Sequence, residues 1–240
     1  MEVVRDTLSR VHSFVGAYKR FTNLDEDLQH KIQQRVYESI LFAFTSPFMS
    51  IIRKECLEKD GKQGLADVPR ILLLGGKPRS GKTTALDFIS RLVGSPDGQY
   101  YQYKDISGTK VVFGMMSENN VFPLFVDEVE SGFLKKSNTA NYGTGMIKAV
   151  TNELEESGPV FFGTTNMDEF SASDAAMRRI YYLAVSNTFD VLPTAKAGGF
   201  LSENLGFQPV ARFLVHRPKH SGVKAGASYT ISRGLDSQIP

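Results

Sequence analysis

The first part of the chain carries apolar residues at every fourth position between residues 24 and 44. Tyr37 and Leu41 lie beside this stripe. Because side chains four positions apart share one face of a helix, the spacing predicts an amphipathic helix of about twenty residues. Such a helix buries its apolar face against another part of the protein.

Polar residues mark both ends of this helix. Thr22 or Asn23 is suited to cap its start, and the acidic residues 25–27 fall in the first turn, where the helix dipole favours negative charge. Ser46 and Pro47 are expected to end it, because proline cannot continue the hydrogen-bonding pattern of a helix.

A second helical stretch follows at about residues 48–58. The glycines and polar residues at 60–64 predict a linker after it. Residues 1–66 are therefore expected to form a helical N-terminal region.

The middle of the chain, residues 67–186, alternates short continuous apolar runs with helical patterns. Continuous apolar runs are typical of strands buried on both faces, and their alternation with helices predicts an α/β fold with a mainly parallel sheet. The runs are Ile71–Leu74, Pro123–Val126, Val160–Phe162 and Ile180–Leu183.

Residues 187–240 show no long helical period, and glycine, serine and proline are frequent among them. From 211 to 240 there are five lysines and arginines against one acid. We interpret this part as an irregular, weakly basic C-terminal segment. An arm that contacts nucleic acid is the alternative.

Composition excludes few classes of function. Apolar residues make up 41% and charged residues 22%, as in ordinary globular proteins, and the net charge of +2 neither demands nor excludes nucleic acid. The single Cys56 excludes a disulfide framework and fits a reducing compartment. No run approaches the roughly 18 apolar residues of a membrane span. We expect a cytoplasmic protein, or one of the host cell interior if it is viral, with no membrane contact.

A glycine-rich segment between the first apolar run and the next helical pattern has the spacing G-x-x-x-x-G-K-[ST]. In the context of strand, loop and helix, this pattern predicts a phosphate-binding loop, whose backbone N–H groups and helix N-terminus attract phosphate oxygens. Lys82 is expected to reach the β- and γ-phosphates of ATP, and the Thr83 hydroxyl to hold Mg²⁺. The residues expected to bind the nucleotide are Gly76, Lys77, Pro78, Arg79, Ser80, Gly81, Lys82, Thr83 and Thr84.

Two carboxylates follow the second apolar run. Asp127, at the end of the strand, is suited to hold Mg²⁺ from the side opposite Thr83. Glu128, directly after it, is suited to accept a proton from the water that attacks the γ-phosphate.

Asn166 follows the third apolar run and is a candidate for contacting the attacking water or the γ-phosphate, the role called sensor 1. The alternative is that Thr165 and Asn166 only turn the chain. Arg178 and Arg179 precede the fourth run. A guanidinium there could stabilise the charge that develops during phosphoryl transfer, and a solvated pair is the alternative.

Together, these motifs resemble the core of AAA+ ATPases. The segment from Thr164 or Thr165 through Arg179 is most similar to the branch of superfamily 3 helicases and related viral, plasmid and phage-type ATPases. The resemblance covers about residues 68–186. It implies a three-layer P-loop NTPase fold and a homo-oligomer, in which an arginine of one subunit reaches the site of its neighbour.

We therefore expect a Mg²⁺-dependent ATPase that works on DNA or RNA in replication or defence. A nucleotide-controlled switch, with the N-terminal helices as the docking surface for a protein partner, is the alternative. A small-molecule kinase ranks last, because that class carries an arginine-rich lid and lacks the Asp-Glu strand followed by an Asn strand.

Overall fold

A computed structural model describes part of the chain, and the segment predicted to be irregular after residue 187 lies outside that part. The described residues are 2–20, 24–66, 68–94, 100–106, 111, 115, 122–130, 133, 147, 159–166 and 178–187.

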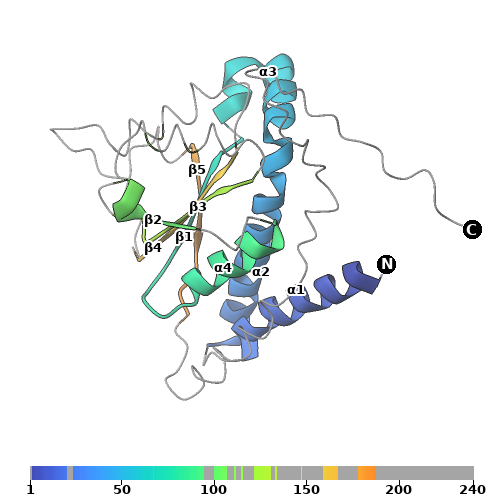
Figure 1. The fold of residues 1–240 in the computed structure, drawn as a ribbon, viewed down its shortest axis with the longest axis vertical. Coiled ribbons are helices and arrows are strands. Elements are labelled where there is room, and N and C mark those ends of the chain that lie inside the picture. Colours follow the sequence, from blue (N-terminus) through green and yellow to red (C-terminus); the bar gives the residue numbers. More distant parts are fainter. Residues whose placement is uncertain are drawn as a thin grey trace, which may run out of the picture.

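Five parallel strands form the centre of the fold (Figure 1). Their order in the sheet is β2-β3-β4-β1-β5. β1 and β4 pair at Gly75↔Thr165, and β1 and β5 pair at Gly75↔Ala184, so the carboxyl ends of these three strands share one edge of the sheet. The predicted parallel α/β fold is confirmed. The strands are β1 (Ile71–Gly75), β2 (Tyr101–Gln102), β3 (Leu124–Asp127), β4 (Phe161–Thr165) and β5 (Ile180–Ala184).

The continuous apolar runs predicted β1, β3 and β4 because all three strands are buried along their whole length. Alternate side chains enter two separate clusters, one on each face of the sheet. Leu72 and Leu74 face the cluster that contains the helices. Ile71 and Leu73 face the other, which includes Ile106, the last residue of the short 3₁₀ helix η3 (Tyr103–Ile106).

Helices before and after β1 cover the first of these faces. They are α1 (Glu2–Arg20), α2 (Glu26–Thr45), the short 3₁₀ helix η1 (Ser46–Phe48), α3 (Met49–Ala66) and α4 (Lys82–Leu92). In Figure 1, α2 and α4 lie side by side on one face of the sheet, and α1 lies outside them.

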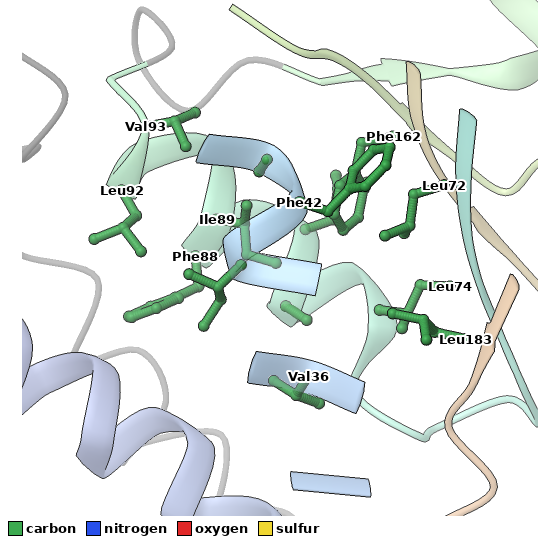
Figure 2. Packing of buried hydrophobic residues seen from close by; sticks show 14 of the residues in the cluster. Val36, Phe42, Leu72, Leu74, Phe88, Ile89, Leu92, Val93, Phe162 and Leu183 are labelled. Atoms are coloured by element: carbon green, nitrogen blue, oxygen red, sulfur yellow. The ribbon is translucent and has the colours of Figure 1, made fainter. Parts of the chain in front are cut away.

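The N-terminal helices share their hydrophobic core with the sheet. Figure 2 shows Val36 and Phe42 of α2 in one cluster with Phe88 of α4 and Leu72 of β1. Phe14 of α1 stacks on Phe88, with ring centroids 3.9 Å apart and 4° between the ring planes. Helices α1 and α2 are thus part of the same folded unit as α4 and the sheet.

The predicted start of α2 is wrong by a few residues. Asp25 is the N-cap: its backbone is extended, and its carboxylate accepts a hydrogen bond from the backbone N–H of Leu28 at 2.9 Å. Thr22 and Asn23 lie outside the described residues. The stripe itself is buried at Ile32 and Val36, whereas Tyr37 and Leu41 are exposed.

The predicted linker at 60–64 is only a break at Gly61, because helical structure resumes after this residue and reaches Ala66. Gly61 is the only departure within this helix, with φ 65° and ψ −159°. Glycine adopts this conformation without the steric cost that a Cβ imposes, so the helix is kinked there and resumes.

Candidate functional site

The predicted phosphate-binding loop connects the carboxyl end of β1 to the start of α4. Its turn requires glycine at two positions. Gly76 has φ 150°, and a Cβ there would lie 2.0 Å from the carbonyl oxygen of Val185. Gly81 is in the left-handed region with φ 82° and forms the N-cap of α4.

Lys82 brings a positive charge into the middle of this loop. Its side chain is buried, and its Nζ donates to the carbonyl oxygens of Gly76 at 2.9 Å and Lys77 at 2.7 Å, and to the Ser80 Oγ at 3.1 Å. By contrast, the side chains of Lys77, Pro78 and Arg79 are exposed. The ammonium group of Lys82 is therefore the charge that the loop encloses.

Thr83 and Asp127 come together although they lie on different elements. The Thr83 hydroxyl is 3.1 Å from Asp127 Oδ2 and 3.2 Å from Oδ1. Among the described residues there is no group of three or more His, Cys, Asp or Glu side chains that could hold a metal. A pair of oxygen ligands fits Mg²⁺, which takes one or two protein oxygens and completes its shell with phosphates and water.

Thr164 holds the two carboxylate residues in place, a role that the sequence interpretation missed. The Thr164 hydroxyl donates to Asp127 Oδ1 and accepts from the backbone N–H of Glu128 at 3.1 Å. Its backbone carbonyl accepts from Val129 N at 2.7 Å. The only signal in the sequence was its position at the start of the segment that resembles the superfamily 3 branch.

Glu128 leaves the sheet in an unusual backbone conformation. Its φ of 58° lies in the left-handed region, which costs free energy for a residue other than glycine, and its side chain is exposed. The hydrogen bond from its N–H to Thr164 stabilises this turn. The carboxylate is thus free to face solvent directly beside buried Asp127.

Asn166 follows the carboxyl end of β4 and is exposed. β4 lies between β1 and β3 and pairs with both. The strand that leads to Asn166 is therefore the direct neighbour of the strand that ends at Asp127. Contact between Asn166 and the γ-phosphate stays a prediction.

Arg178 and Arg179 lie away from this group. They precede β5, whose carboxyl end pairs beside Gly75, so both arginines lie toward the opposite edge of the sheet. A strand of five residues spans about 16 Å. In their own chain these arginines are therefore separated from the loop by the length of β5.

Tyr100, just before β2, is a further residue near Asp127 that the sequence interpretation missed. Burial raises the pKa of its hydroxyl, and the negative charges of Asp127 and Asp87 raise it further. The phenol therefore remains neutral at physiological pH, where it can donate a hydrogen bond.

Comparison with known proteins agrees with the geometry of the loop. A family model described as the Aq_aa27 P-loop NTPase domain matches residues 1–169. The chain belongs to this family.

The range shared with the Aq_aa27 family includes α1, α2 and α3 as well as the loop, and it ends before Arg178. An uncharacterized protein of Aquifex aeolicus (strain VF5), aq_aa27, is 28% identical over 127 residues. These residues are 52% of this chain and 48% of the relative, so the chain matches about half of that protein's length.

Membership in the Aq_aa27 family identifies the chain as a P-loop NTPase and indicates nucleotide binding and hydrolysis. The description of this family names P-loop NTPases and does not name the superfamily 3 branch. None of the described helices combines the length and the hydrophobicity that a transmembrane span needs.

Proposed function

We propose that this protein is a Mg²⁺-dependent ATPase of the AAA+ type. The observation that carries the proposal is the meeting of the Thr83 hydroxyl and the Asp127 carboxylate, 3.1 Å apart, beside a loop that encloses the Lys82 ammonium group. This combination provides a positive charge for the phosphates and two oxygens for the metal in one place.

Each side chain of the site has a distinct task in this proposal. Lys82 and the N–H groups of the loop bind the phosphates, while Thr83 and Asp127 hold Mg²⁺. Bound Mg²⁺ supplies charge neutralisation at the phosphate oxygens. Glu128 accepts the proton of the attacking water, and Asn166 orients that water from the neighbouring strand. The exposed carboxylate beside a buried one supports this division of roles.

Arg178 or Arg179 acts on the site of a neighbouring subunit. The separation of both residues from their own loop by the length of β5 supports this arrangement. A guanidinium matches the spread charge of the transferring phosphoryl group, and an arginine supplied in trans accelerates related reactions by about 10³ to 10⁵. The active form is accordingly a homo-oligomer.

The work done with ATP is proposed to be on nucleic acid, as in helicases and remodelling ATPases of replication or defence. This part rests on the resemblance of the motif set to the superfamily 3 branch. ATP turnover with and without single-stranded DNA tests it, with the Glu128→Gln variant as the blank. Stimulation by DNA in the wild type supports a motor on nucleic acid, and identical rates with and without DNA contradict it.

A nucleotide-controlled switch is the second candidate, and the N-terminal helices favour it. They expose large apolar side chains, which are common at protein interfaces. These are Val4 and Leu8 on α1, Tyr37 and Leu41 on α2, and Ile51 on α3. A switch predicts no response to DNA and a change in the protein's association state when ATP replaces ADP.

A further inference from the structure

A side chain of the N-terminal helix α1 contacts the phosphate loop directly. Tyr18 is fully buried, and its hydroxyl donates to the carbonyl oxygen of Gly81 at 2.9 Å, across 63 positions of the sequence. Its ring packs edge to face on Phe14, with the centroids 5.8 Å apart. Burial raises the pKa of Tyr18 well above its ordinary value, so the hydroxyl keeps the proton that it donates.

This contact determines the direction of a backbone N–H group. The Gly81 carbonyl and the Lys82 N–H belong to one planar trans peptide unit, in which C=O and N–H point in opposite directions. The Gly81 carbonyl also accepts the first hydrogen bond of α4, from Ala85 N at 2.9 Å. With its carbonyl held by two donors, this peptide unit directs the Lys82 N–H out of the N-terminal end of the helix, the end at which the loop joins it.

Asn187 holds the carbonyl of the preceding peptide unit, which joins Ser80 to Gly81. It follows β5, is fully buried, and its Nδ2 donates to the carbonyl oxygen of Ser80 at 3.4 Å. That carbonyl shares its peptide unit with the N–H of Gly81. In the described part of the chain, the Oδ1 of Asn187 is buried without a hydrogen-bond partner, a costly arrangement that structures rarely keep without a reason.

We propose that Tyr18 and Asn187 are positioning residues, which aim the backbone N–H groups of Lys82 and Gly81 at the phosphates of the nucleotide. Neither residue belongs to the loop, and they reach it from α1 and from the segment after β5. Two consecutive donors are thereby oriented before the nucleotide arrives, which lowers the cost of ordering the loop on binding. The inference rests on the proposed function, because it concerns the same nucleotide site.

Tyr18→Phe is the main test, with Tyr181→Phe as the matched control. The Tyr181 hydroxyl also donates a 2.9 Å hydrogen bond, to Glu38, at the contact between β5 and α2. Both substitutions keep the aromatic ring and remove one hydroxyl. We expect Tyr18→Phe to weaken ATP·Mg²⁺ binding about five- to tenfold, the effect of one lost hydrogen bond, and Tyr181→Phe to leave the affinity within about twofold of wild type.

A readout at the two amides separates positioning from general destabilisation. In ¹⁵N NMR spectra, titration of the wild type with ATP·Mg²⁺ is expected to shift the Gly81 and Lys82 amide signals. Tyr18→Phe should reduce the shift of Lys82, and Asn187→Ala should reduce that of Gly81. Asn187→Ala also keeps the inference testable if Tyr18→Phe does not fold.

The outcomes distinguish this inference from the proposed function. Wild type that binds ATP no better than Lys82→Ala contradicts the proposed function itself. Wild type that binds ATP, together with Tyr18→Phe and Asn187→Ala variants that match it in affinity and in both amide shifts, overturns the positioning role alone.

Discussion

Replacing Thr164 by valine tests the network that holds the two carboxylate residues. Thr164 is buried, and its hydroxyl makes two hydrogen bonds at once, to the carboxylate of Asp127 and from the N–H of Glu128. Valine has the same shape but can make neither. A hydrogen bond to a charged group contributes about 1.5–3 kcal/mol, and an unsatisfied buried N–H costs about 1–3 kcal/mol.

We expect the loss of stability to be smaller than the sum of these two free-energy contributions. The Asp127 carboxylate keeps its contact with Thr83, and the side chain of Glu128 is exposed, so water can reach the nearby backbone. We therefore expect the free energy of unfolding to fall by about 3 kcal/mol. For a domain of this size, that corresponds to a decrease of about 6–12 °C in the midpoint of thermal unfolding.

Thermal and urea unfolding followed by circular dichroism measure this loss. Thr45→Val is the control, because the Thr45 hydroxyl donates a hydrogen bond within its own helix, to the carbonyl of Phe42 at 2.7 Å. Its loss should cost less than about 1 kcal/mol. Thr164→Val should also raise the Mg²⁺ concentration needed for turnover. A Thr164→Val protein as stable as Thr45→Val, with unchanged Mg²⁺ dependence, would refute the network.

Three further predictions concern individual side chains. Asp127→Asn should weaken the Mg²⁺ dependence of ATP binding, whereas Glu128→Gln should keep ATP bound and stop turnover, because an amide cannot accept the proton; equal loss of binding in both would mean that the roles are misassigned. Arg178→Ala, or the same change at Arg179, should silence turnover while each subunit still binds ATP, and mixing with Lys82→Ala should restore some activity. No recovery in the mixture, with turnover independent of protein concentration in the wild type, would indicate a monomer. Stability should fall above about pH 10, because unfolded Tyr18 releases a proton that the folded state retains. Between pH 8 and pH 10.5, the midpoint of thermal unfolding should fall less in Tyr18→Phe than in wild type. An equal fall in the two proteins would contradict the raised pKa of Tyr18.

The sheet and the loop could be predicted from the sequence because their signals are local. Strands buried on both faces appear as continuous apolar runs, and the loop needs glycines and a lysine at fixed spacing. Asp127 could be predicted as the partner of Thr83 because it follows an apolar run directly, and the parallel strands β1, β4 and β3 bring the two residues together. These inferences need no knowledge of distant contacts.

The contacts around the loop could not be predicted in the same way. Tyr18 looks like an ordinary residue on the apolar face of a helix, and only the packing of α1 brings its hydroxyl to Gly81. Thr164 depends similarly on Asp127 of β3, and Asn187 depends on Ser80 of the loop. The kink at Gly61 was mistaken for a linker because glycine permits both a loop and a broken helix.

The central claim is that the loop around Lys82 binds ATP with Mg²⁺. Calorimetric titration of the wild type, Lys82→Ala and Lys54→Ala with ATP, in the presence and absence of Mg²⁺, tests it most directly. Lys54 is the control because it is an exposed lysine on α3, paired with Glu58. We predict that wild type and Lys54→Ala bind ATP alike and more tightly with Mg²⁺, and that Lys82→Ala loses about a hundredfold in affinity. Equal affinity in all three proteins would contradict the account.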